Sequence, residues 1–426
     1  MEEAKTKGGS LGFLFSAVYY LSYFTRYTYA AVLAELIVNL GVTKSQAGIA
    51  QTGFFFVYGV AQIFAGILGD RHQPKNVILF GLLGTSVVNV AMCFMSNIYV
   101  MAAVWMVNGF FQSMFWPPLV RLVNHSFKGK KYNKVITIIC QACNLGTVCI
   151  YLCAAGLISI SSWRIVFAVS GGTGLLFSLI WFFTTRKHLL DNTPAPAAAS
   201  DEAQPKGKLT FRRLAALGAL PVFAAIVING CLRDGVSSWL TTYLNESFDF
   251  GTSFSIMSGA VIPIFGVLCL TVTAIIISKI RNELRMASIF YLFTSGLAVL
   301  LAVFFRNAIP VDILLFALIA GTMHGTNLIV IADYPHYFAR YGKISTFSGI
   351  LNAFVYLGSA ISIYGVARLA EVFGWKITFI VWACVAVVAA VACFLASLHW
   401  SDIEKGLDTS PAPAPPPEDT DTDPVN

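Results

Sequence analysis

The chain has 426 residues, of which 57% are hydrophobic and only 12% are charged. Soluble domains carry about twice that share of charged residues, so the composition excludes an ordinary soluble protein and predicts an integral membrane protein whose first partner is the lipid bilayer. The net charge of +7 would suit nucleic-acid binding, but the positions of the charges argue against it, and we expect no nucleic-acid partner.

Hydropathy predicts twelve membrane-spanning helices in chain order. The expected spans are 11–38, 48–69, 77–95, 98–123, 134–159, 163–184, 214–244, 252–277, 286–305, 311–333, 345–370 and 374–398. These segments are long enough to cross a bilayer as helices and too long for the strands of a membrane barrel. We therefore expect an all-α membrane protein.

The longest connection, 185–213, divides the twelve spans into two groups of six. Its centre, 193–205, is rich in proline and alanine, which is typical of linkers. The expected domains are an N-terminal six-helix half (1–184), a cytoplasmic linker (185–213), a C-terminal six-helix half (214–400), and a disordered Pro-rich and acidic cytoplasmic tail (401–426).

Lysine and arginine are distributed unequally between the two sides of the membrane. If the amino terminus is cytoplasmic, 21 of the 28 lie inside, 5 lie outside and 2 lie within the membrane. The positive-inside rule then places both termini in the cytoplasm. Outer loops are short and carry no glycosylation sequon apart from Asn245, which favours a bacterial inner membrane.

Two arginines lie inside apolar spans. Arg26 shares one helical face with Tyr19 and Tyr23, because the three residues follow at spacings of four and three. Arg233 lies in the seventh span. A charge at the bilayer centre costs about 3 to more than 10 kcal/mol, so such residues usually face the protein interior or a wet cavity. Guanidinium groups bind phosphate or carboxylate through paired hydrogen bonds, so the two arginines predict an anion site.

The segment that closes the second span, 66–71, has the sequence Gly-Ile-Leu-Gly-Asp-Arg. In this position it resembles the loop signature of the major facilitator superfamily. The resemblance implies two pseudo-symmetric six-helix halves, and it implies that Asp70 and Arg71 belong to a gate on the cytoplasmic side. The corresponding loop after the eighth span lacks the aspartate.

The fourth span contains Gly109, Gln112, Trp116-Pro117-Pro118 and Arg121, with two prolines that bend a membrane helix. This pattern resembles the fourth helix of the organophosphate:inorganic phosphate antiporters, the family of glycerol-3-phosphate and hexose-phosphate transporters. The resemblance extends over about 13–398. The candidate substrate-binding residues that follow from it and from the arginines are Arg26, Arg233, Tyr19, Tyr23, Tyr58, Gln62, Trp116, Asn144, His324 and Tyr356.

Four positions depart from the resembling carriers. Gln62 stands where bacterial phosphate-ester carriers have a lysine, Cys143 where they have a histidine, and His324 where one of them has a tyrosine. Asp234, directly after Arg233, either removes positive charge from the site as a buried ion pair or points away from it. Asp234 and His324 are also candidates for proton coupling.

The sequence thus predicts a secondary transporter of a small organic anion that works by alternating access. The favoured substrate is a phosphate ester exchanged for inorganic phosphate. A proton-coupled symporter of sugar acids or carboxylates and a sugar-phosphate sensor of the same fold remain open. The chain carries no HExxH or P-loop motif. Cys140 and Cys143 are separated by two residues but lie in an apolar segment, where small packing residues are favoured over a zinc pair. We therefore expect neither an enzyme, nor a metal site, nor a cofactor, and we expect a monomer.

Overall fold

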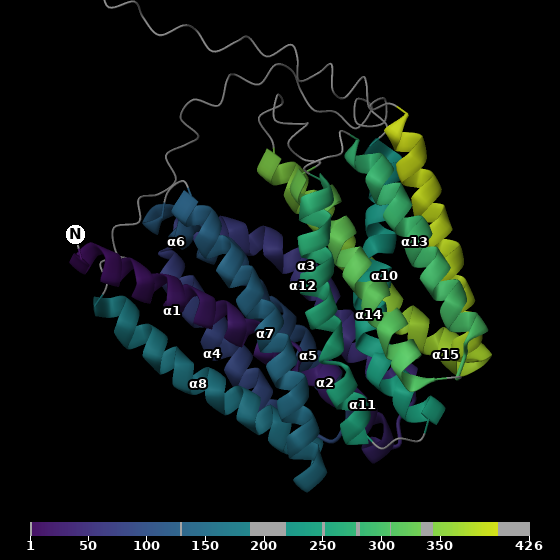
Figure 1. Ribbon diagram of the computed structural model, residues 1–426. Helices are drawn as coiled ribbons and strands as arrows, with labels where there is room; N and C mark the ends of the chain where they lie inside the picture. Colours follow the sequence, from purple (N-terminus) through teal and green to yellow (C-terminus); the bar gives the residue numbers. More distant parts are fainter. Residues whose placement is uncertain are drawn as a thin grey trace, which may run out of the picture.

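The computed structural model describes residues 2–127, 130–187, 219–248, 252–277, 282–306, 308–333 and 344–398. Within these ranges a few side chains are not described, among them those of Asp70 and Arg71. The described residues form helices and connecting turns without a β-strand, and helices from the first and second parts of the chain gather on opposite sides of the molecule (Figure 1).

The first part of the chain forms eight helical segments. They are α1 (Glu2–Arg26), α2 (Thr28–Leu40), α3 (Lys44–Arg71), α4 (Pro74–Met92), α5 (Ile98–Ser113), α6 (Trp116–Ser126), α7 (Lys130–Ile160) and α8 (Trp163–Lys187). The second part forms α10 (Ala219–Phe248), α11 (Thr252–Ser258), α12 (Val261–Ile277), α13 (Glu283–Val303), α14 (Ile309–Asn327), the π-helix η1 (Leu328–Asp333) and α15 (Ile344–Ser397).

Breaks within spans reconcile these segments with twelve crossings. The pairs α1–α2, α5–α6 and α11–α12 are each one span that is interrupted by one or two non-helical residues, and η1 continues α14. The long α15 contains two helices that meet at Gly374, whose φ of 79° lies in the left-handed region that glycine adopts without strain. The expected twelve-helix, two-half fold class is therefore confirmed. The domain boundaries stay a prediction, because most of the expected linker lies outside the described residues.

Within the described residues, nine helices are long and apolar enough to cross a membrane by length and composition alone. The segment Ile350–Ser397 is one of the nine and covers most of two expected spans, 345–370 and 374–398. Neither α1 nor α3 is among them, and these two helices supply much of the polar site described below. The nine do include α10, α14 and α15, which carry Arg233, His324 and Tyr356.

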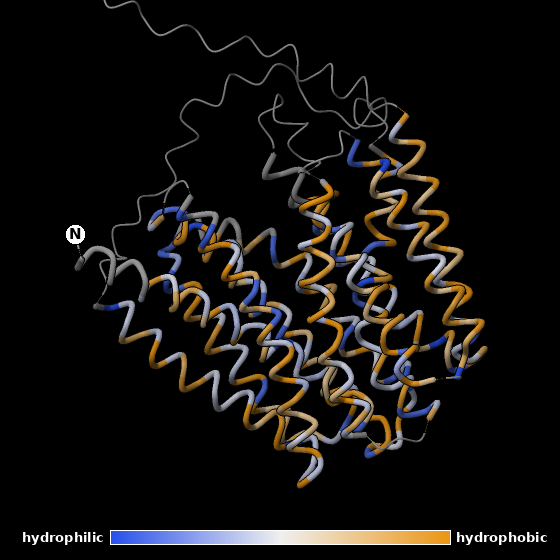
Figure 2. Tube along the Cα trace, viewed as in Figure 1, coloured by the Kyte–Doolittle hydropathy of each residue, from blue (hydrophilic) through white to orange (hydrophobic). Residues whose placement is uncertain are grey.

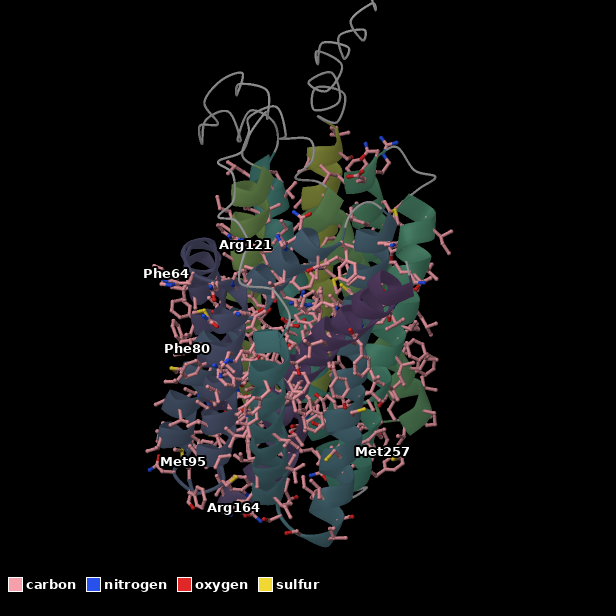
Figure 3. The ribbon with its side chains drawn as sticks, turned by 90° about the vertical axis from the view of Figure 1, so that its left-hand side faces the viewer. Phe64, Phe80, Met95, Arg121, Arg164 and Met257 are labelled. Carbon is pink, nitrogen blue, oxygen red and sulfur yellow. The ribbon has the colours of Figure 1, made fainter. Side chains whose placement is uncertain are left out.

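The outer surface is apolar, as a lipid-facing surface requires. Phe64 and Phe80 are 59% and 49% exposed, and Figure 3 shows both at the lateral face of the bundle. Figure 2 shows hydrophobic residues along most of the helical length. Met95 and Arg164, which follow α4 and α7, lie toward the same end in Figure 3, as expected for alternating spans.

Helix pairs approach closely where glycine replaces a side chain. A Cβ at Gly358 on α15 would stand 1.9 Å from the carbonyl oxygen of Val227 on α10, and one at Gly230 would stand 1.9 Å from that of Val355. Small residues at such positions let membrane helices pack backbone to backbone. This packing fixes α10 against the first half of α15, and both helices contribute to the site.

Candidate functional site

Arg26 is the last residue of α1, where the first span bends before α2 begins at Thr28. The backbone hydrogen bonds continue across the bend, from Tyr27 N–H to the Tyr23 carbonyl and from Ala31 N–H to the Tyr27 carbonyl. The arginine is only 4% exposed. The bend thus places a cation in the interior of the protein instead of at the lipid surface.

The Arg26 guanidinium is surrounded by aromatic rings. Its central carbon lies 4.3 Å from the ring centroid of Tyr58, and four further rings, those of Phe54, Phe55, Tyr23 and Tyr356, lie within 5.6 Å. Each cation–π contact contributes about 0.5–2 kcal/mol, depending on solvation. These faces stabilise the charge without neutralising it.

Arg26 has no ion-pair partner among the residues that the structure describes. Its Nε atom is buried and makes no hydrogen bond within the same residues. An unpaired, buried donor on a charged group is costly, and a ligand, an ion or a water molecule at the donor would remove that cost.

Arg233, on α10, has a different environment. Its Nε and Nη2 atoms donate to the two carboxylate oxygens of Asp234 at 2.9 and 2.7 Å, and Nη1 donates to Asn327 Oδ1 at 3.2 Å. The Ser359 hydroxyl, on α15, donates to Asp234 Oδ2 at 2.6 Å. Of the two interpretations that the sequence left open, the structure shows the buried ion pair.

Tyr356 connects the two arginines. Its ring centroid lies 5.6 Å from the central carbon of the Arg26 guanidinium and 5.8 Å from that of Arg233. The ring also lies 4.6 Å from that of Tyr58, with which it makes an edge contact. One aromatic side chain from α15 therefore lies beside a cation from each half of the molecule.

A cavity of about 30 Å³ lies next to this centre. Its lining comes from both halves: Tyr23, Tyr27, Asn144, Thr147, Tyr151, Ser237, Gly259, Ile262, Pro263 and His324. This volume corresponds to about one water molecule, whereas sites for small organic ligands measure about 300 Å³ or more. The structure therefore shows the site contracted, and the halves must separate before an organic substrate enters.

The remaining predicted residues lie around this centre at different distances. Asn144 and His324 line the cavity itself. Trp116, the first residue of α6, packs its ring 5.0 Å from that of Tyr19, which in turn lies 5.2 Å from Tyr23. Trp116 and Tyr19 thus extend the aromatic wall from Tyr23 toward α6.

Gln62 connects the two halves. It donates to the Tyr58 hydroxyl at 2.8 Å and accepts from Asn352 Nδ2, on α15, at 2.6 Å. Where the resembling carriers have a cation, this chain has an amide that fastens α3 to α15. The side chains of the predicted gate, Asp70 and Arg71, lie outside the described part of the chain, and only their position at the end of α3 is described.

Several residues of the site were not predicted. Phe54 and Phe55 face Arg26, and Asn327 and Ser359 hold the Arg233–Asp234 pair. Each of the four has a helical spacing to a predicted residue. Phe54 and Phe55 are four and three residues before Tyr58, Asn327 is three after His324, and Ser359 is three after Tyr356.

The end of the molecule that carries Lys44 is closed by polar contacts between the halves. Lys44 Nζ pairs with Glu246 at 2.9 Å, and the Ser45 backbone N–H and hydroxyl donate to Glu371 at 2.6 and 2.9 Å. Trp375 Nε1 donates to Glu246 at 2.8 Å. We call these five residues the outer clasp.

Two buried arginines between two six-helix halves, which are closed at one end by contacts between them, form the arrangement of a membrane transporter of the alternating-access type. The model of the Major Facilitator Superfamily matches residues 15–363, so the chain belongs to this superfamily. The resemblance seen in the second-span loop is thereby confirmed. The superfamily and the fold are those of transporters, not of enzymes.

Known relatives extend the comparison. The chain is 26% identical to a probable hexose phosphate transport protein of Chlamydia pneumoniae, over 91% of this chain and 90% of the relative. It is 29% identical to the membrane sensor protein UhpC of Salmonella typhimurium over 41% of this chain and 40% of the sensor, and 24% identical to the glycerol-3-phosphate transporter of Bacillus subtilis over about half of each. These relatives confirm the resemblance to the organophosphate antiporter family.

Among solved structures, a bacterial homologue of the human lysosomal transporter Spinster, in an inward-facing and occupied conformation, matches with a TM-score of 0.74. The match covers 93% of this chain and 98% of the homologue at 16% identity. At this identity the likeness supports the fold alone.

Proposed function

We propose that this protein is a secondary transporter that carries a small phosphate ester across the membrane by alternating access and exchanges it for inorganic phosphate. The named relatives, a hexose phosphate transport protein and a glycerol-3-phosphate transporter, support this substrate class. The observation that carries the proposal is Arg26, a buried guanidinium without an ion pair among the described residues, next to a cavity between the halves.

The mechanism starts from the charge of Arg26. An anion that enters between the halves gives the Nε donor a partner and replaces the water that the guanidinium has lost. Tyr23, Tyr58 and Tyr356 orient the substrate around the charged group. Because Tyr356 belongs to the second half and contacts both arginines, substrate binding favours the state in which the two halves, 1–184 and 214–400, close on each other. Only a difference in substrate affinity between the states drives such a shift.

A sensor of sugar phosphate is the second candidate. The similarity to the sensor UhpC, at 32% identity with the Escherichia coli protein over 25% of this chain, favours it specifically. A sensor binds the ligand and changes conformation without net flux, whereas a transporter accumulates ligand across a sealed membrane.

The proposed location is the cytoplasmic membrane of a bacterium, with both termini inside and the outer clasp facing outward. The Lys/Arg asymmetry and the bacterial origin of several relatives support this orientation. In this membrane the protein works as a monomer, because each chain already supplies both halves of the site.

The test is an exchange assay with the purified full chain in liposomes loaded with inorganic phosphate. Radiolabelled glucose 6-phosphate and glycerol 3-phosphate are added outside, and uptake is measured with and without internal phosphate. Uptake that depends on internal phosphate supports the proposal. Uptake of a sugar acid driven by a pH gradient without internal phosphate would instead establish a proton symporter, and binding without flux would establish a sensor.

A further inference from the structure

The two arginines of the site differ in whether a carboxylate neutralises their charge. Arg233 shares both carboxylate oxygens of Asp234 in a two-pronged ion pair, whereas Arg26 faces aromatic rings and has no carboxylate partner among the described residues. Both arginines are more than nine-tenths buried. Arg26, Arg233 and Asp234 together therefore present one net positive charge to a ligand.

Asp234 is fixed in place by more than its neighbour. The Ser359 hydroxyl donates to its Oδ2 at 2.6 Å and also approaches the Val355 carbonyl at 3.0 Å. Asn327 binds the other side of Arg233 at 3.2 Å. The pair is thus held by three helices, α10, α14 and α15, and Asp234 is only 4% exposed. Turning Asp234 away from Arg233 would break its hydrogen bonds to Arg233 on α10 and to Ser359 on α15.

Building on the proposed function, we infer that Asp234 is a resident counter-ion that occupies the second arginine and makes the site selective for esters with a single negative charge. The substrate anion binds Arg26, and Arg233 remains paired with Asp234. A doubly charged phosphate leaves one negative charge without a cation in a buried site, which is costly. Ser359 is a positioning residue that keeps the carboxylate on Arg233.

The chain has no substitute cation in the described surroundings of the cavity. Gln62, the position at which the resembling carriers have a lysine, binds Tyr58 and Asn352. His324 lines the cavity and is the remaining ionisable group there whose protonation adds positive charge. The test is therefore made at pH 8, at the upper limit of the range in which histidine normally changes its charge.

Two ligands of matched shape separate the charge states. Glucose 6-sulfate carries one negative charge at pH 8, whereas glucose 6-phosphate carries two, because the second pKa of a phosphate ester is near 6. Binding of each to the purified full chain is measured by calorimetry. The unmodified protein is expected to bind the sulfate ester at least as tightly as the phosphate ester. A clear preference for the phosphate ester would overturn the inference without any variant.

The Asp234→Asn variant keeps the side-chain size and frees the charge of Arg233. Its preference is expected to move toward the phosphate ester by about tenfold or more, since a second full cation then faces the ligand. Asp234→Glu retains the charge and should retain the preference for the sulfate ester. An unchanged ratio in a folded Asp234→Asn protein, judged by its elution as a single species in size-exclusion chromatography, would contradict the inference.

The binding measurements distinguish failure of this inference about Asp234 from failure of the proposed function. If neither ester binds the unmodified protein, the proposed substrate class is wrong. If both bind and the phosphate ester is preferred, the substrate class stands and the role of Asp234 fails.

Discussion

At the scale of single residues, the two intramembrane arginines have unequal surroundings although both lie within 6 Å of the same tyrosine ring. The sequence predicted that both face the interior, and it left the partner of Arg233 open. Their burial follows from the cost of a charge in lipid, which any fold must avoid. The direction of the Asp234 carboxylate depends on Ser359, which lies 125 residues further along the chain.

We expect Arg26→Lys to abolish transport while the protein remains folded. A lysine retains the charge but loses the planar fork that binds a tetrahedral anion through two parallel hydrogen bonds. Initial rates of phosphate-ester uptake into liposomes should fall by about a hundredfold or more. This fall corresponds to an increase of about 3 kcal/mol in the activation free energy of transport. The matched control is Arg164→Lys, at a half-buried arginine outside the site whose described hydrogen bond goes to Ser96. Normal uptake by Arg26→Lys would contradict the anion-carrier model.

At the scale of elements, the site depends on how closely α10 packs against α15. The reciprocal glycines, Gly230 and Gly358, permit this approach because each faces a backbone carbonyl of the other helix. The spans themselves were predicted from local hydropathy to within a few residues. Which glycines lie at the contact was not, because a glycine at an interface and a glycine facing lipid look alike in a single sequence.

Gly358→Ala is expected to destabilise the protein by about 1–3 kcal/mol, because the added methyl group overlaps the Val227 carbonyl and forces the helices apart. The measurement is the midpoint of thermal unfolding in detergent. Gly365→Ala, on the same helix, is the matched control, since a Cβ there meets no atom within 4 Å. Equal midpoints for the two variants would contradict the prediction, because they would show that the helices accommodate a methyl group at position 358 without loss of stability.

At the scale of the whole molecule, polar contacts hold the two halves together at two places along α3. The outer clasp joins the start of α3 to α10 and α15, and Gln62 joins the middle of α3 to Asn352. The contracted cavity is lined by residues of both halves. This arrangement indicates that α3 is the element of the first half that must separate from α15 when the clasp end opens.

Glu371 carries part of the outer clasp as an ionised carboxylate. Burial alone raises its pKa, but the hydrogen bonds from the Ser45 backbone and hydroxyl outweigh burial and lower the pKa of Glu371 below its ordinary value. A lowered pKa in the closed state means that the closing interaction is present at neutral pH and is lost as the pH at this end of the molecule falls through that pKa.

Glu371→Gln should therefore shift the protein toward states that are open at the clasp end at neutral pH. Spin labels are placed at Ile160 and Phe304, which are both exposed at the clasp end, in a background without native cysteines. Double electron–electron resonance then reports the distance between the halves. Longer distances are expected for Glu371→Gln. Arg368→Gln should change them little, because Arg368 is exposed and surface ion pairs contribute about 0–1 kcal/mol. Identical distances for Glu371→Gln and the unmodified protein would contradict a role of the Glu371 carboxylate in holding the halves closed.

The sequence by itself determined that the chain crosses a membrane twelve times, belongs to a two-half architecture and buries a cation in each half. These properties follow from hydropathy, spacing and charge, which act over one or two helical turns. The tertiary structure alone decided that Arg233 is neutralised, that Tyr356 lies beside both arginines, and that Gln62 fastens α3 to α15. These contacts join residues more than a hundred positions apart or depend on a side-chain direction set by such residues, and a linear pattern does not encode them.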